Sequence, residues 1–143
     1  MTEIILGDTG LDMRNLETLG LGSEALFSTE DPELVDFNET SIVLRDPVTL
    51  ATISVFGNFA SEDLDSILID RIAVSTPTNG TLFVAGGLGL TFERAQTLLA
   101  AGGGITSAIN LFLTGDDFFT GSPGNDVLNA LTGNDLMNGG SGN

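Results

Sequence analysis

The chain has 143 residues, the size of one ordinary domain, and its 41% of hydrophobic residues is enough to bury a core. Twenty acids against four arginines and no lysine give a net charge of −16, which repels nucleic acid and anionic membranes and attracts divalent cations. Without histidine or cysteine the chain cannot build a Ser-His-Asp triad, a thiol nucleophile, a disulfide or a zinc site of the usual nitrogen and sulfur ligands.

The first forty residues are loosely patterned. Residues 1–10 carry an acid and a short apolar run, 4–6, so we expect a short strand and no cleaved signal peptide, and no segment has the length of a membrane span. Residues 7–12 repeat a Gly-x-x-Gly-x-Asp spacing, which we attribute to chance because Arg14 stands where an apolar residue is needed. Residues 30–36 predict an acidic turn around Pro32.

Residues 40–85 carry strong strand patterns. Residues 41–45 and 48–56 predict a hairpin that turns at Asp46, and 61–66 predict an acidic loop or helical turn. Strict alternation predicts a strand over 67–75, with Ile67, Ile69, Arg71 and Ala73 on one face and Leu68, Asp70, Ile72 and Val74 on the other. An Asn-Gly turn then returns the chain into an antiparallel partner strand over 81–85.

One helix is predicted before the C-terminal segment. Thr91 can cap a helix that runs to Ala101, and its apolar residues Phe92, Ala95, Leu98 and Leu99 have the spacing of a face that packs on a sheet. Residues 105–113 predict a last strand that leads into the C-terminal segment without a linker. We therefore expect the upstream domain to cap that segment.

The last thirty residues repeat with a period of nine. Glycine recurs at Gly115, Gly124, Gly133 and Gly142, aspartate at Asp117, Asp126 and Asp135, and a large apolar residue at Phe119, Leu128 and Met137. Each block therefore repeats a turn, an acid and a short strand. Turns that present backbone carbonyls beside carboxylates suit a hard cation such as Ca²⁺, whereas the alternative is a flexible Gly/Asp/Asn-rich tail.

This segment resembles the G-G-x-G-x-D-x-U-x nonapeptide of RTX (repeats-in-toxin, haemolysin-type calcium-binding) proteins. The resemblance implies parallel β-rolls with Ca²⁺ between the turns, and it places turns on one edge two blocks apart. Asp117 and Asp135 would then share an edge and flank one ion, whereas Asp126 would lack a partner. Blocks starting at Phe112, Gly121 and Ala130 lack one or both leading glycines. The metal-ligand candidates are Asp117, Asp135, Asp126, Gly115, Asp116, Gly124, Asn125, Gly133 and Asn134.

The resemblance also implies export by type I secretion, which reads an uncleaved C-terminal signal. No such signal follows, and the chain stops inside a repeat, so we expect a fragment of a longer protein. Low Ca²⁺ inside the cell would leave the repeats unfolded, and Ca²⁺ outside would fold them.

The sequence thus predicts a mainly β protein: an antiparallel sandwich-like domain with one short helix over residues 1–113, and an incomplete parallel β-roll over 114–143. We expect a secreted, non-enzymatic calcium-binding module without nucleic-acid partners. An adhesin or surface-layer component that binds an extracellular protein or polysaccharide is the alternative. A glycan-active enzyme would have to use carboxylates alone, such as Glu30, Glu33, Asp63 and Asp65.

Overall fold

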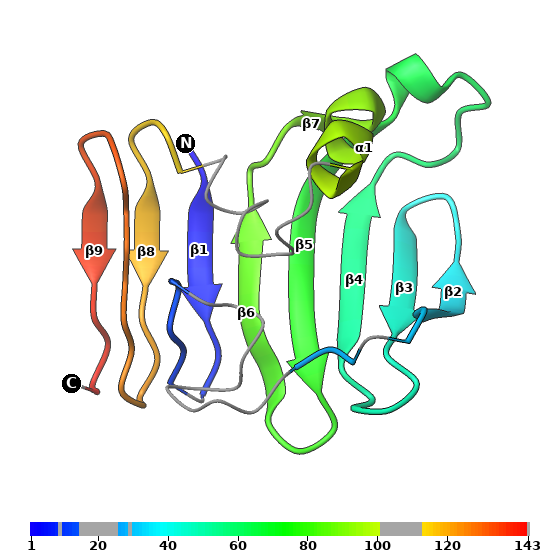
Figure 1. Cartoon of the computed structure of the whole chain (residues 1–143). Helices are drawn as coiled ribbons and strands as arrows, with labels where there is room; N and C mark the ends of the chain where they lie inside the picture. The colour runs from blue at the N-terminus through cyan, green and yellow to red at the C-terminus, as the bar shows by residue number, and fades with distance from the viewer. Residues whose placement is uncertain (9, 15–25, 29, 101–112, 143) are drawn as a thin grey trace.

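A computed structural model describes residues 1–8, 10–14, 26–28, 30–100 and 113–142. Their strands join in one mixed, nine-stranded sheet with the order β2-β3-β4-β5-β6-β1-β8-β9, and β7 pairs with β5 outside this path (Figure 1). The strands are β1 (Glu3–Leu6), β2 (Glu33–Phe37), β3 (Ser41–Arg45), β4 (Thr52–Gly57), β5 (Leu68–Thr76), β6 (Gly80–Gly86), β7 (Leu90–Thr91), β8 (Phe118–Thr120) and β9 (Leu136–Asn138), with the 3-10 helix η1 (Leu64–Ser66) and the helix α1 (Phe92–Ala100) between them.

Strands β2 to β6 are antiparallel to their neighbours, and the hairpins β3-β4 and β5-β6 are those that the alternating pattern predicts. The sequence predicts the wrong face of the sheet for the side chains in the first half of β5. Arg71 pairs with Phe56 and Ile69 with Gly57, so Asp70 is an extra residue in β5 at this bulge. The alternation therefore changes phase at Asp70, and Ile69 is buried like Val74 further along the strand.

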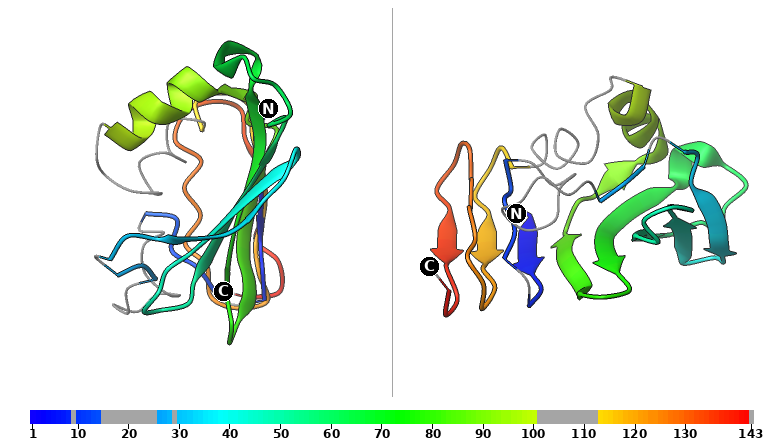
Figure 2. Two further views of the ribbon diagram at one scale, coloured as in Figure 1. Left: turned by 90° about the vertical axis from the view of Figure 1, so that its right-hand side faces the viewer. Right: turned by 60° about the horizontal axis from the view of Figure 1, so that its bottom comes forward.

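Helix α1 begins where the sequence predicts. The Arg94 amide donates to Thr91 Oγ1 at 3.3 Å, as expected of an N-cap, and Glu93 lies in the first turn. The helix contacts η1 and β7 and lies on one side of the sheet (Figure 2). The side chains of Leu98 and Leu99 are outside the described part of the chain, as is the end of the predicted helix at Ala101.

One face of the sheet is apolar and forms the core. Ile4, Phe83 and Val74 lie on this face at its centre and are almost fully buried. Burial falls toward both edges, where Leu34 in β2 is 63% exposed and Met137 in β9 is 53% exposed. The buried cluster comprises Ile4, Leu6, Leu11, Met13, Leu26, Val74, Leu82, Phe83, Ala85, Leu113 and Phe119.

Strand β1 joins the antiparallel and parallel parts of the sheet. Ile4 pairs with Ala85 of β6 in antiparallel register and with Phe119 of β8 in parallel register. Strand β8 then pairs with β9 in parallel register, Phe119 opposite Met137. The N-terminal strand therefore separates the long hairpins from the repeats.

Several expectations need correction. The described strands form one sheet, so the antiparallel sandwich is not observed. Residues 33–37 form an edge strand where we expected an acidic turn around Pro32. The strand expected over 48–56 starts only at Thr52, because residues 46–51 turn with Leu50 at a φ of 61°. The strand expected over 105–113 lies outside the described residues except for Leu113.

Candidate metal site

The repeats stack two turns directly on each other at one edge of the sheet, residues 114–117 on 132–135. The Asp117 amide donates to Asp135 Oδ1, and the Asn134 amide donates to Asp116 Oδ1, both at 3.0 Å. The Leu136 amide donates to the Asp117 carbonyl at 2.9 Å. Asp117 and Asp135, eighteen residues apart, thus share an edge, as the resemblance to RTX repeats implies.

Close stacking depends on glycine. A Cβ atom at Gly133, where φ is 142°, would collide with the Gly115 carbonyl oxygen of the turn below. At the opposite edge, a Cβ atom at Gly142 would collide with the Gly124 carbonyl oxygen. Backbone oxygens are therefore held between successive turns at both edges, which is the ligand type that Ca²⁺ prefers.

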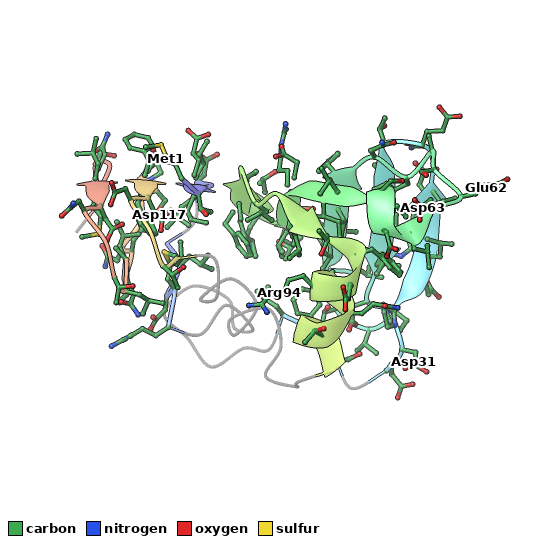
Figure 3. The ribbon with its side chains drawn as sticks, turned by 90° about the horizontal axis from the view of Figure 1, so that it is seen from above. Met1, Asp31, Glu62, Asp63, Arg94 and Asp117 are labelled. Atoms are coloured by element: carbon green, nitrogen blue, oxygen red, sulfur yellow. The ribbon has the colours of Figure 1, made fainter. Side chains whose placement is uncertain are left out.

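Asp117 is the most buried carboxylate of the repeats, at 3% exposure. Its Oδ1 accepts the Thr2 amide at 2.7 Å, whereas its Oδ2 is buried and has no hydrogen-bond partner among the described residues. A buried carboxylate oxygen without a partner is costly unless a positive charge compensates it. Figure 3 shows Asp117 beside Met1, at the β1-β8 junction.

Asp126 lies at the other edge, in the turn of residues 121–126. Its carboxylate accepts the Ser122 amide at 2.6 Å, the Ser122 hydroxyl at 2.8 Å and the Leu11 amide at 3.0 Å. The Leu11 amide thus contacts Asp126 in the same way as the Thr2 amide contacts Asp117. Gly124 and Asn125 belong to this same turn, and both lie against Gly10.

The nine candidates thus divide between two edges, which the sequence spacing anticipated. The edge of stacked turns brings together Gly115, Asp116, Asp117, Gly133, Asn134 and Asp135, and the opposite edge holds Gly124, Asn125 and Asp126. Among the described residues, no three acidic side chains form a cluster that could hold a metal by themselves. A cation here would draw its remaining ligands from backbone carbonyls.

The sequence analysis missed the N-terminal segment as a part of this stack. The pairs Thr2-Asp117 and Leu11-Asp126 are both 115 residues apart, so residues 2–13 follow the repeats in constant register. Met13, 1% exposed, takes the apolar position that we assigned to Arg14. The Gly-x-x-Gly-x-Asp spacing of residues 7–12 was the sequence signal for this stacking. It is displaced by one residue from the register of the structure, in which Leu11, and not Asp12, lies against Asp126.

Asp12 is consequently not at a ligand position. Its carboxylate binds the Arg14 guanidinium at 2.9 and 2.7 Å, and this hydrogen bonding, reinforced by the Arg14 charge, lowers the pKa of Asp12 below its ordinary value.

The carboxylates considered for a glycan-active enzyme make contacts of their own outside the repeats. Glu33 pairs with Arg45 at 2.9 Å, and Asp63 accepts the Asp65 amide at η1. Figure 3 shows Asp63 far from Asp117, at the other end of the sheet. A pocket of about 330 Å³ on the polar face is lined by none of the four, its lining being Glu3, Ile5, Asp70, Arg71, Val84, Gly86 and Gly87.

Comparison with known families identifies the C-terminal segment. Residues 113–143 match the family model of the RTX calcium-binding nonapeptide repeat, in four copies. RTX nonapeptide repeats bind Ca²⁺. No curated protein and no solved structure matched the chain. In the described part of the chain, no helix is both long enough and apolar enough for a membrane crossing.

Proposed function

We propose that this chain is a non-enzymatic calcium-binding module of an exported RTX protein, in which Ca²⁺ binding orders the stacked turns of residues 114–117 and 132–135 and completes a parallel β-roll. The observation that carries the proposal is the stacked pair Asp117 and Asp135 next to the buried Oδ2 of Asp117, which has no hydrogen-bond partner among the described residues. The site fits a hard divalent cation, because its donors are oxygens and the chain has no histidine or cysteine.

Asp117 and Asp135 would supply the two negative charges of this site. Backbone carbonyls of residues 115–117 and 133–135 would complete an all-oxygen shell, and the Gly115 carbonyl already faces the next turn. Ca²⁺ accepts six to eight such ligands in flexible geometry. Asp116, whose carboxylate accepts the Asn134 amide, ties the two turns together from the outside.

A β-roll is supported by the parallel contacts of the repeats. Strands β8 and β9 pair in parallel, and an isolated parallel bridge joins Asp12 to Val127. In Figure 2 the chain between β8 and β9 runs apart from the sheet, on the side of α1. A chain that leaves the sheet between two parallel neighbouring strands and returns to it supports the proposal of a roll.

Folding would be coupled to export because Ca²⁺ binds the folded repeats and not the unfolded ones. The unfolded repeats offer no preformed site, so Ca²⁺ binding stabilises the folded state by an amount that grows with free Ca²⁺. Low Ca²⁺ inside the cell would leave the turns of Asp117 and Asp135 unstacked, and higher Ca²⁺ outside would order them.

The test is the double variant Asp117→Asn with Asp135→Asn. Calorimetric titration of the metal-free full chain should show saturable Ca²⁺ binding for the wild type and at least tenfold weaker binding for the variant, since two charge-assisted contacts are lost. Asp31→Asn with Asp65→Asn is the control, because it removes the same charge at exposed residues outside the repeats. Unchanged Ca²⁺ affinity in the first variant would refute the site.

A further inference from the structure

The two edges of the repeat stack differ in how their carboxylates are satisfied. One oxygen of Asp117 is buried and has no hydrogen-bond partner in the described part of the chain, whereas both oxygens of Asp126 accept hydrogen bonds. We infer that Asp126 and Ser122 form a metal-independent latch that fastens the N-terminal segment, residues 2–13, to the repeats. This inference goes beyond the proposed function, because the latch operates without Ca²⁺.

Ser122 donates two hydrogen bonds to the Asp126 carboxylate, at the oxygens that a cation would otherwise occupy. It is 1% exposed, its amide donates to Asp126 Oδ2 and its hydroxyl donates to Asp126 Oδ1. The same hydroxyl accepts the Gly124 amide at 3.0 Å, so the turn is closed by its own side chain. Serine stands here where the RTX motif has its second glycine, which has no hydroxyl to offer.

The N-terminal segment adds the third donor. The Leu11 amide donates to Asp126 Oδ1 at 3.0 Å, and parallel backbone hydrogen bonds of 2.9 Å run from Val127 to Leu11 and from Met13 to Val127. Leu11 and Met13 are both at most 1% exposed, so these bonds are made inside the core. A Cβ atom at Gly10 would collide with the Asn125 carbonyl oxygen, which shows how closely the segment lies on the turn.

A cation at Asp126 would have to compete with three hydrogen-bond donors that already occupy both carboxylate oxygens, which makes this edge a poor binding site. The same donors hold the carboxylate in place at any Ca²⁺ concentration. Residues 2–13 therefore stay attached to the turn at 121–126 in the metal-free protein. They give the repeats an ordered first coil, against which the turns of Asp117 and Asp135 can stack when Ca²⁺ arrives.

The latch is tested by backbone hydrogen exchange in the full chain, measured by NMR in EDTA and in saturating Ca²⁺. The amides of Leu11 and Met13 should be protected in both buffers, with rates that agree within about threefold. Fast exchange of both amides in EDTA, with protection only in Ca²⁺, would overturn the inference. This result is independent of whether Ca²⁺ binds at Asp117, so the two proposals fail separately.

Variants on each side of the latch sharpen the test. Ser122→Ala and Asp126→Asn should each raise the exchange rate of the Leu11 amide in EDTA by roughly tenfold or more, and Asp135→Asn, at the opposite edge, should not. Gly10→Ala should act like Asp126→Asn, whereas Gly86→Ala, which meets no atom within 4 Å, is its control. Equal effects of Asp126→Asn and Asp135→Asn on the exchange rate of the Leu11 amide would contradict the latch. If a variant fails to fold, the comparison of wild-type exchange rates in EDTA and in Ca²⁺ still tests the inference.

Discussion

Asp46 shows how one carboxylate can hold two distant segments together. It is 4% exposed, its Oδ1 accepts the amides of Val48 and Thr49, and its Oδ2 accepts the amide and hydroxyl of Ser28. Burial acts to raise its pKa, but the hydrogen bonds from Thr49, Ser28 and Val48 outweigh burial and hold the pKa of Asp46 far below its ordinary value. The charged form is therefore the stabilising one.

We expect the contribution of Asp46 to stability to depend on pH in acid. Because its folded pKa lies below the unfolded one, the stabilisation is complete well above pH 4, begins to fall as the pH drops through that value, and continues to fall until the pH is below the folded pKa. Urea unfolding of the wild type and of Asp46→Asn, from pH 7 to pH 3, should show a gap that narrows in acid. Asp31→Asn, at an exposed carboxylate, is the control, and a gap that widens in acid would contradict this role.

The positions of two individual residues were predictable through the resemblance to RTX repeats. That resemblance implied that Asp117 and Asp135 share an edge, and their turns do stack there. No local pattern indicates that Asp126 receives the Leu11 amide or that Asp46 receives Ser28. Those contacts join parts of the chain that only the tertiary fold makes adjacent.

Among the elements, β8 and β9 offer a matched pair of apolar side chains. Phe119 is fully buried, and Met137, its partner in the parallel register, is 53% exposed. We expect Phe119→Ala to lower the free energy of unfolding by about 3–5 kcal/mol. Met137→Ala should cost less than about 1 kcal/mol. Urea denaturation measures both, and equal losses would show that β9 is as covered as β8.

The stacking of the turns can be tested with glycines. Gly133→Ala introduces a Cβ atom against the Gly115 carbonyl at a positive φ, so we expect it to separate the turns that hold Asp117 and Asp135 and to weaken Ca²⁺ binding at least tenfold. Gly139→Ala is the control, because its Cβ meets no atom within 4 Å. Calcium titration compares them, and equal affinities would argue against close stacking at the site.

Elements were predictable where alternation or capping is local. Strands β3, β5 and β6 and helix α1 follow from their own residues. The bulge at Asp70 was not predictable, since it is set by the pairing with Gly57. The sequence predicts an acidic turn where β2 lies, because Pro32 and the acidic residues of 30–36 suit a turn. All side chains of β2 are exposed, and the segment is a strand only through its pairing with β3.

At the scale of the whole molecule, the described strands form one sheet with the repeats at one end, in a strongly acidic chain. A net charge of −16 makes the chain repel itself, and salt screens that repulsion over about 10 Å at 0.1 M. In EDTA, we therefore expect the melting temperature to rise when NaCl increases from about 0.01 to 0.15 M. Differential scanning calorimetry checks this, and a fall with salt would mean that favourable charge pairs dominate.

The mainly β class was predictable from the whole sequence, but the arrangement of the strands was not. Strand β1, at the start of the chain, lies between β6 and β8, and no pattern within residues 3–6 specifies those partners. Local alternation predicts that strands exist and leaves open whether they join in one sheet or two. The docking of residues 2–13 on the repeats is the clearest instance, since it spans 115 residues.

The most direct test of the account is calorimetric titration of the metal-free full chain with Ca²⁺, with circular dichroism recorded in the same buffer. We expect saturable binding accompanied by a gain in β signal, because Ca²⁺ stabilises only the folded repeats. Absence of binding heat and of any spectral change up to millimolar Ca²⁺ would contradict a calcium-folded module.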